Sequence, residues 1–176
     1  WTDANDAYFS TGGTSDVTVA GIVSPAELRV NASSTVNLIG AGSVSATNVR
    51  VGQDSTGILN IKDTVSLASS GSFYLGNPSN IAGTVNQSGG TVTHTGAWDS
   101  FRIAHWPNET STYTLSAGSL SATNNITVGW NGVGILNISG GSVSAAAINV
   151  AKGGGSNGSQ VNISGSPTIT LSQLFV

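Results

Sequence analysis

Residues 134–151 read GILNISGGSVSAAAINVA, and this stretch decides the fold. Apolar and polar residues alternate in three short segments, and the pair Gly140–Gly141 follows the first of them. Alternation with a period of two is typical of β-strands that bury one face, so the stretch predicts three strands joined by corners, with glycines at positive φ. One such coil cannot bury its apolar side alone, whereas stacked copies can.

Related stretches recur along the chain. Residues 35–52 (TVNLIGAGSVSATNVRVG) and 112–129 (TYTLSAGSLSATNNITVG) are close copies, and residues 58–76 and 84–104 are longer variants. A degenerate copy covers residues 16–30, and a last copy begins at Gln160. The repeats predict an all-β fold, a parallel β-helix (β-solenoid) of about seven coils with three short strands each, which we expect to be right-handed.

The composition fits an ordered protein with few charges. Only 7% of the 176 residues are charged, against about 25% in an ordinary globular protein. The hydrophobic 38% follow a strict pattern, which excludes disorder. The net charge of −3 indicates no basic surface, so we expect no nucleic-acid partner. Because the chain has no cysteine, disulfides and thiolate metal sites are excluded, and we expect neither a metal nor another cofactor.

Several features favour a location outside the cell. The chain has no apolar run near the roughly 18 residues of a membrane span, so we expect no membrane insertion. It has no methionine, even at position 1, which predicts processing from a larger precursor. A composition rich in Ser, Thr, Asn and Gly without cysteine favours an extracellular or cell-surface protein.

Residues 1–16, WTDANDAYFSTGGTSD, lie outside the regular repeat. The end of a solenoid exposes an apolar cross-section and needs a cap. We therefore interpret residues 1–16 as an N-terminal cap whose aromatic residues Trp1, Tyr8 and Phe9 fold over the first coil, with a linker as the alternative. Residues 17–176 then form the solenoid as a single domain.

The alternation assigns inward and outward positions in every coil. Gln87 falls on an inward position and breaks the apolar rule. The inward residues of the second strands are Val44, Val65, Val92, Leu120, Val143 and Ile169. The outward residues of the first strands form a polar ladder, which we expect to stabilise the stack through side-chain hydrogen bonds; its members are Thr18, Asn37, Asn60, Asn86, Thr114, Asn137 and Asn162.

The third strands carry an outward ladder of unusual composition, in which every arginine of the chain lies. Three arginines and a tyrosine on one face can bind an anionic glycan or pair with acids of a neighbouring subunit. The alternative is a solvated face in which the arginine stems lie over Tyr74. Candidate acidic partners are Asp3, Asp6, Asp16 and Glu27, and the ladder consists of Arg29, Arg50, Tyr74, Arg102, Thr127 and Asn149.

The longest coil adds a second cluster. By register His105 and Trp130 occupy equivalent corners, so Trp106 and Trp130 are expected to lie close together. Exposed tryptophans stack well on sugar rings or on a partner protein, and the alternative is that the loop packs its own hydrophobic cluster. The cluster consists of His94, Trp98, Asp99, His105, Trp106 and Trp130.

The repeat resembles the autotransporter-associated β-strand repeat of large secreted bacterial proteins. The resemblance covers nearly the whole chain and is carried by GILNISGGSVSA (134–145), GTVNQSGGTVT (83–93), ANDAYFSTGG (4–13) and VTVAG (17–21). It implies a surface or extracellular passenger with an adhesive or structural role.

We therefore predict a structural protomer that assembles with itself, end to end or laterally, into a surface filament. The C-terminal strand ends apolar, so either the native protein continues beyond Val176 or this end docks onto a partner. An uncapped strand edge is a template for pairing. The alternative is a carbohydrate-binding adhesin module that uses the arginines and tryptophans, with glycans as partners. The expected assembly residues are Trp1, Tyr8, Phe9, Leu171, Leu174, Phe175 and Val176.

Two further function classes are weaker. A polysaccharide lyase or hydrolase needs paired carboxylates, yet the acids of the coils lie scattered at corners, so we do not expect an enzyme. His94, Asp99 and nearby serines could be combined into a serine–histidine–aspartate triad. Because serine is abundant in this chain, their presence together is weak evidence for one. Ice binding needs ranked threonines, whereas the second strands mix serine and threonine.

Overall fold

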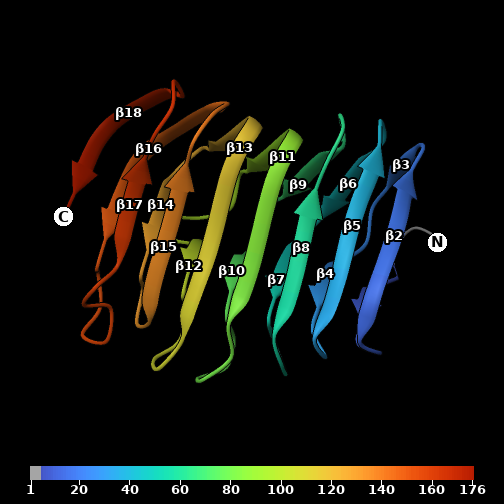
Figure 1. Ribbon diagram of the computed structural model, residues 1–176, viewed down its shortest axis with the longest axis horizontal. Helices are drawn as coiled ribbons and strands as arrows, with labels where there is room; N and C mark the ends of the chain where they lie inside the picture. The colour runs from blue at the N-terminus through green and yellow to red at the C-terminus, as the bar shows by residue number, and fades with distance from the viewer. Residues whose placement is uncertain (1–4) are drawn as a thin grey trace.

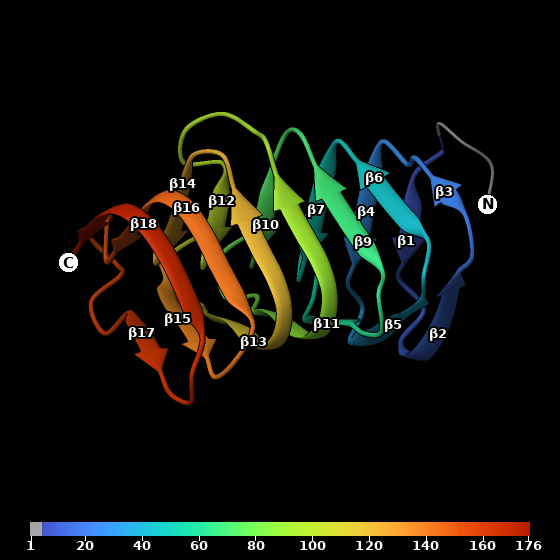
Figure 2. The ribbon, with the colours of Figure 1, turned by 90° about the horizontal axis from the view of Figure 1, so that it is seen from above.

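The computed structural model describes residues 5–176. It is all-β, without a helix, and its parallel strands stack into a β-solenoid of about 7 turns, which confirms the predicted parallel β-helix (Figure 1). The first and last described strands lie at opposite ends of the stack (Figure 2). Within residues 5–176 no helix is long and apolar enough to cross a membrane.

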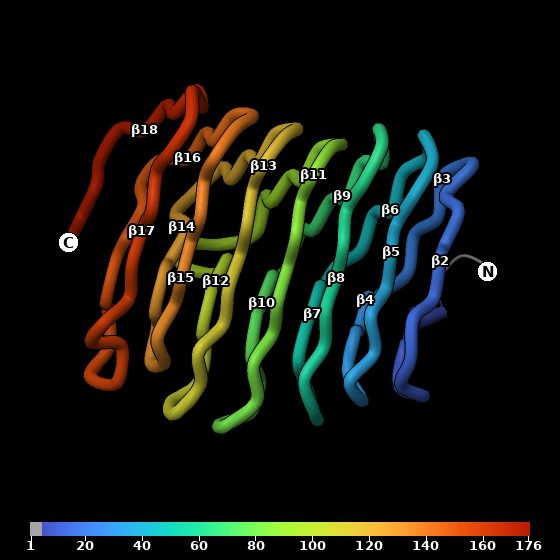
Figure 3. Tube along the Cα trace, in the orientation of Figure 1, coloured from blue at the N-terminus to red at the C-terminus, as the bar shows by residue number. Residues whose placement is uncertain are grey.

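Each coil contributes strands to three faces, and each strand pairs with its counterparts in the neighbouring coils (Figure 3). β11, β13, β16 and β18 are long enough to continue from one face to the next. The first face is formed by β2 (Gly13–Val19), β5 (Ser34–Gly40), β8 (Gly57–Ile61), the beginnings of β11 (Gly83–His94) and β13 (Thr110–Ala122), β15 (Val133–Ile138) and β17 (Gln160–Ile163).

The second and third faces complete the coil. The second face is formed by β3 (Ile22–Val23), β6 (Ser43–Ala46), β9 (Ser66–Ser69), the later parts of β11 and β13, and the beginnings of β16 (Ser142–Val150) and β18 (Thr168–Phe175). The third face is formed by β1 (Ala7–Phe9), β4 (Glu27–Val30), β7 (Asn48–Val51), β10 (Phe73–Leu75), β12 (Phe101–Ile103), β14 (Asn125–Val128) and the later parts of β16 and β18.

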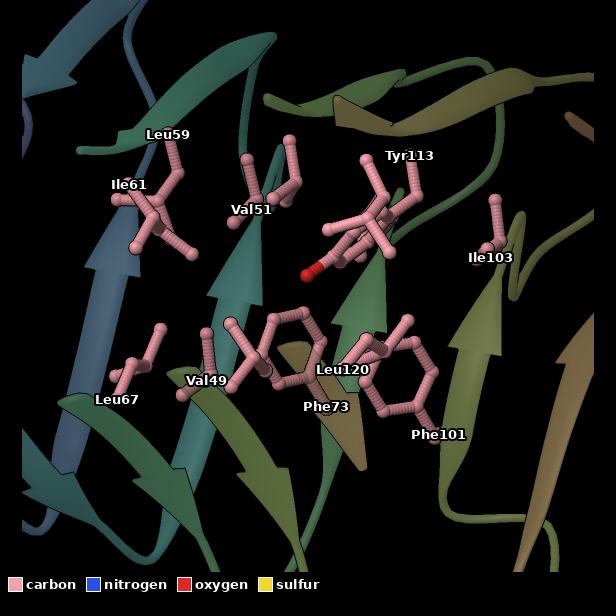
Figure 4. Close-up of a cluster of buried hydrophobic side chains, with 14 of the residues drawn as sticks. Val49, Val51, Leu59, Ile61, Leu67, Phe73, Phe101, Ile103, Tyr113 and Leu120 are labelled. Carbon is pink, nitrogen blue, oxygen red and sulfur yellow. The ribbon is translucent and has the colours of Figure 1, made fainter. Parts of the chain in front are cut away.

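Inward residues of successive coils lie directly above one another and form the core. At its centre the rings of Phe73 and Phe101 stack with 4.5 Å between their centroids, and the ring of Tyr113 tilts against both (Figure 4). All three side chains are fully buried. Burying apolar area at roughly 25 cal/mol per Å² stabilises the stack, and no single coil provides this burial alone.

Gly140 and Gly141 are each required to be glycine, but for different reasons. Gly141 has a φ of 71°, in the left-handed region that favours glycine, as expected. Gly140 does not have a positive φ. A Cβ at Gly140 would lie 2.3 Å from the carbonyl oxygen of Ser116 in the preceding coil, so the close approach of two corners requires glycine there.

Two register assignments made from the sequence are wrong. Asp16, not Thr18, pairs with Asn37 at the start of the polar ladder, and the Asn37 amide donates a hydrogen bond of 2.6 Å to the Asp16 carboxylate. On the second face Leu67, not Val65, pairs with Val44. In both cases the chain offset between the two coils stays the same through the preceding corner, so the corner does not cause the difference. An alternation with a period of two is satisfied equally well by two residues that are two positions apart and face the same way, so it leaves the register between coils open by two residues.

The N-terminal segment is partly strand. Trp1 lies outside the described residues, so its predicted capping role stays a prediction. Tyr8 and Phe9 belong to β1, with the half-exposed Tyr8 opposite Arg29 and Phe9 packed against the core. β2 runs from Gly13 to Val19, across the boundary drawn at residues 16 and 17.

Candidate functional site

The outward ladder of the third face has the predicted register. Arg29, Arg50, Tyr74, Arg102 and their successors lie opposite one another in adjacent coils. The ladder also extends to two aromatic residues, one at each end, that were expected in the N-terminal cap and at the C-terminal edge. From the N-terminal to the C-terminal end it reads Tyr8, Arg29, Arg50, Tyr74, Arg102, Thr127, Asn149 and Phe175.

The chain's own acids hold the first two arginines. Glu27 lies 2.8 Å from the Arg29 guanidinium and 3.2 Å from that of Arg50, and Asp54 approaches Arg29 at 3.6 Å. The Arg29 guanidinium also covers the Tyr8 ring at 4.5 Å. Of the acids proposed as partners, Glu27 thus pairs with two arginines of its own chain.

Other predicted acids have different roles. Asp6 accepts a hydrogen bond of 2.6 Å from the Tyr8 hydroxyl, and this bond is the main cause that raises the pKa of Tyr8 to about 12. Asp16 accepts from Asn37 in the polar ladder. Asp3 lies outside the described residues.

Arg102 is the centre of a cation–aromatic cluster. Its guanidinium lies 5.3 Å from the centroid of Tyr74 and 3.8 Å from that of Trp130. Its Nη1 donates to Nδ1 of His105 at 3.0 Å, and the His105 ring stacks on Tyr74 with centroids 4.1 Å apart. Burial, together with the positive charges of Arg102 and Arg50, lowers the pKa of His105 to about 4, so the imidazole is neutral and accepts.

The two indoles expected to be neighbours have different partners. Trp130 is covered by Arg102 and by Lys152, whose ammonium lies 4.9 Å from the ring centroid. Trp106 contacts His105 edge-on with 5.4 Å between centroids. The structure therefore connects Trp106 to Trp130 through His105 and Arg102.

Asp99 fixes the loop that carries Trp98. Its Oδ1 accepts hydrogen bonds from Thr127 at 3.2 Å, from Asn149 at 3.3 Å and from Asn125 at 3.4 Å, and its Oδ2 pairs with Lys152. Burial opposes ionisation of Asp99, but these partners outweigh it and hold its pKa below the usual value. One carboxylate thus holds the loop of residues 95–100 over the next two coils.

Glu109 fixes the corner that carries Trp106. Its side chain is buried, and Oε1 accepts from the Trp106 backbone N–H at 3.0 Å, whereas buried Oε2 has no hydrogen-bond partner. Burial raises the pKa of Glu109 to about 8. A Cβ on Gly76 would lie 1.9 Å from Oε2, so the carboxyl group occupies space that only glycine leaves free.

These two anchored loops present tryptophan to solvent at both ends of β12. Trp98 is 67% exposed and Trp106 is 41% exposed. Arg102 lies between them in β12. The Trp130 ring is covered by Arg102 and Lys152. Arg29 and Arg50 pair with Glu27 instead.

His94 is a structural residue of the core. It is fully buried, Nδ1 lies 2.8 Å from the Ser69 hydroxyl, and Nε2 lies 2.8 Å from that of Ser100. Ser100 donates its own proton to the Ala97 carbonyl, so it accepts from Nε2–H, and Nδ1 accepts from Ser69. Asp99 bonds other partners, and the residues that a catalytic triad would need are not assembled. The described residues also contain no group of three or more His, Asp or Glu side chains placed to hold a metal ion.

The two ends of the described stack are apolar. At the N-terminal end a hollow of about 580 Å³ is lined by residues of β1, β2 and β3 and their connections, including Ala7, Phe9, Val19 and Val23. At the C-terminal end the strands of the last coil pair on one side only. Exposed apolar side chains there are Ile163, Leu174, Phe175 and Val176, and Leu171 packs partly against the core.

Comparison with known proteins identifies no relative. The chain matches no protein-family model, no curated protein and no solved structure. The resemblance to the autotransporter-associated repeat stays a prediction.

Proposed function

We propose that the protein is an extracellular structural β-solenoid that assembles with further copies of itself, end to end, into a surface filament. The observation that carries this proposal is that both ends of the described stack present unpaired strand edges beside apolar side chains. A second copy satisfies both chemistries, because its own end supplies parallel strand edges and an apolar cross-section. Strand addition at a sheet edge is a general mode of protein recognition.

The columns of the stack support a head-to-tail contact. Ile163 lies on the inward column that begins with Val17, and Ile169 lies on the column that begins with Val23. In a stack extended by a second copy, apolar residues therefore meet apolar residues. Because the two ends are different surfaces, this contact is heterologous and does not close on itself, which gives a filament.

Sedimentation velocity across a wide concentration range tests the proposal, with negative-stain electron microscopy beside it. Wild-type protein is expected to form rods longer than one protomer. Ile163→Asp places a charge on the C-terminal end, where Ile163 is 60% exposed, and is expected to leave monomers. Ile58→Asp is the matched control, because Ile58 is 37% exposed on the side of the stack. Monomeric wild-type protein at all concentrations overturns the proposal, and equal loss in both variants indicates lateral contacts instead.

A second candidate function is glycan binding by an adhesin module. The observation that favours it is that two exposed tryptophans, Trp98 and Trp106, stand on loops fixed by buried or clamped carboxylates. Rigid, exposed indoles are suited to stacking on sugar rings. A glycan array tests this candidate, and Trp98→Ala with Trp106→Ala is expected to abolish binding. Trp130→Phe is the matched control, because cations already cover the Trp130 ring.

A further inference from the structure

Within residues 5–176, the third face contains one strand more than either other face. At the N-terminal end the first face begins with β2 and the second with β3, but on the third face β1 pairs with β4 one level further out. At the C-terminal end the last coil contributes one strand to each face: β17, the first part of β18 and the later part of β18. The stack therefore has a step at its N-terminal end, and the hollow of about 580 Å³ lies beside that step.

The extra strand prevents a second copy from pairing on all three faces at once. If β17 and the first part of β18 paired with β2 and β3 of the next copy, the later part of β18 would fall on the level that β1 occupies. If β18 paired with β1 instead, the first and second faces would each lack one strand, a spacing of about 4.8 Å. Complete pairing therefore requires β1 to leave β4.

The two competing segments have the same pattern. β1 reads Ala7-Tyr8-Phe9, and the end of β18 continues as Leu174-Phe175-Val176, so each has an aromatic residue between two apolar residues. The aromatic residue lies on the outward ladder in both, opposite Arg29 or Asn149. In place of Tyr8, Phe175 of another copy would meet the Arg29 guanidinium, which now lies 4.5 Å from the Tyr8 ring centroid.

We propose that β1 is a placeholder strand: it covers the site on β4 that the end of β18 from a preceding copy takes, and its release permits assembly. This inference rests on the proposed function and adds the register and the control of the contact. β1 pairs through three residues on one face. A docked copy pairs on all three faces and fills the step, so the exchange replaces a short pairing by a longer one.

A reversible cross-link tests the proposal. Tyr8→Cys with Arg29→Cys places two cysteines on an in-register outward pair, whose strand spacing of about 4.8 Å suits a disulfide, and the chain has no other cysteine. The oxidised protein is expected to stay monomeric, with association at least about tenfold weaker than in the reduced protein. Ser119→Cys with Ser142→Cys is the matched control, because it cross-links a middle pair of coils and leaves association unchanged.

A second variant releases β1 without a cross-link. Ala7→Asp puts a charge where Ala7 is buried against β4, which detaches β1 and is expected to strengthen association. Equal association of the oxidised and reduced forms overturns the placeholder role while the proposed function stands. Absence of association in wild type, in the reduced pair and in Ala7→Asp overturns the proposed function itself. Association of the wild type that is lost only in the oxidised pair and strengthened in Ala7→Asp supports both.

Discussion

The hydroxyl of Tyr113 donates a hydrogen bond of 2.7 Å to Oε1 of Gln87 inside the core of the β-helix. Gln87 in turn donates from Nε2 to the backbone carbonyl of Ser119 at 2.9 Å and lies near two glycine carbonyls at the corner. Both side chains are fully buried. The inward glutamine that interrupts the apolar pattern is therefore the partner of an inward tyrosine one coil further on, and together they form a satisfied polar pair.

Removing the Tyr113 hydroxyl tests how much the hydrogen bond between Tyr113 and Gln87 contributes to the free energy of unfolding. Tyr113→Phe leaves Gln87 Oε1 buried without a donor, so we expect a loss of about 1–3 kcal/mol in the free energy of unfolding. Urea denaturation measures it. Tyr74→Phe is the control, because Tyr74 lies half-buried on the third face, and we expect a change within about 0.5 kcal/mol. Equal effects of the two substitutions would contradict a specific role for the buried bond.

The buried His94 is expected to make the protein less stable in acid. Burial lowers its pKa to about 4 in the folded protein, whereas an unfolded histidine titrates near 6.5. The unfolded chain therefore binds a proton first as pH falls below about 6.5, and stability decreases until about pH 4, by about 3 kcal/mol in total. His94→Gln is expected to flatten this part of a stability–pH curve measured by urea denaturation. A curve with the wild-type slope would assign the acid sensitivity to other groups, His105 first among them.

The buried Glu109 is expected to have the opposite effect, a loss of stability as pH rises. Burial raises its folded pKa to about 8, and an unfolded glutamate titrates near 4.3. Below that value both states are protonated and nothing is lost, but between about 4.3 and 8 unfolding releases a proton, so stability falls as pH rises. Glu109→Gln is expected to remove this decline, so that the gain in stability of the variant over the wild type is larger at pH 8 than at pH 5. Chemical denaturation at the two pH values measures it, and an unchanged decline in the variant contradicts the assignment.

The repeat made the fold predictable, but alternation alone left some registers open by two residues. Alternation fixes which residues point inward, so the third-face ladder from Arg29 to Asn149 had the right register. It does not fix which of two residues that face the same way and lie two positions apart aligns with the neighbouring coil, which is why Thr18 and Val65 were misplaced. The contacts of Asp99 were also beyond prediction, because they depend on how a loop folds back over coils up to 53 residues away.

Asp99, which has several hydrogen-bond partners, and the exposed Asp54 are expected to differ in how much they contribute to stability. Asp99→Ala leaves Asn125, Thr127 and Asn149 without their acceptor and releases the loop that carries Trp98, so we expect a loss of about 1–3 kcal/mol. Asp54→Ala removes an exposed acid 3.6 Å from Arg29, and a surface ion pair of this kind contributes about 0–1 kcal/mol. Urea denaturation compares the two, and faster hydrogen exchange at residues 95–100 is expected only in Asp99→Ala. If exchange there does not change, the loop is held by its other contacts, and Asp99 instead joins the coils of β14 and β16.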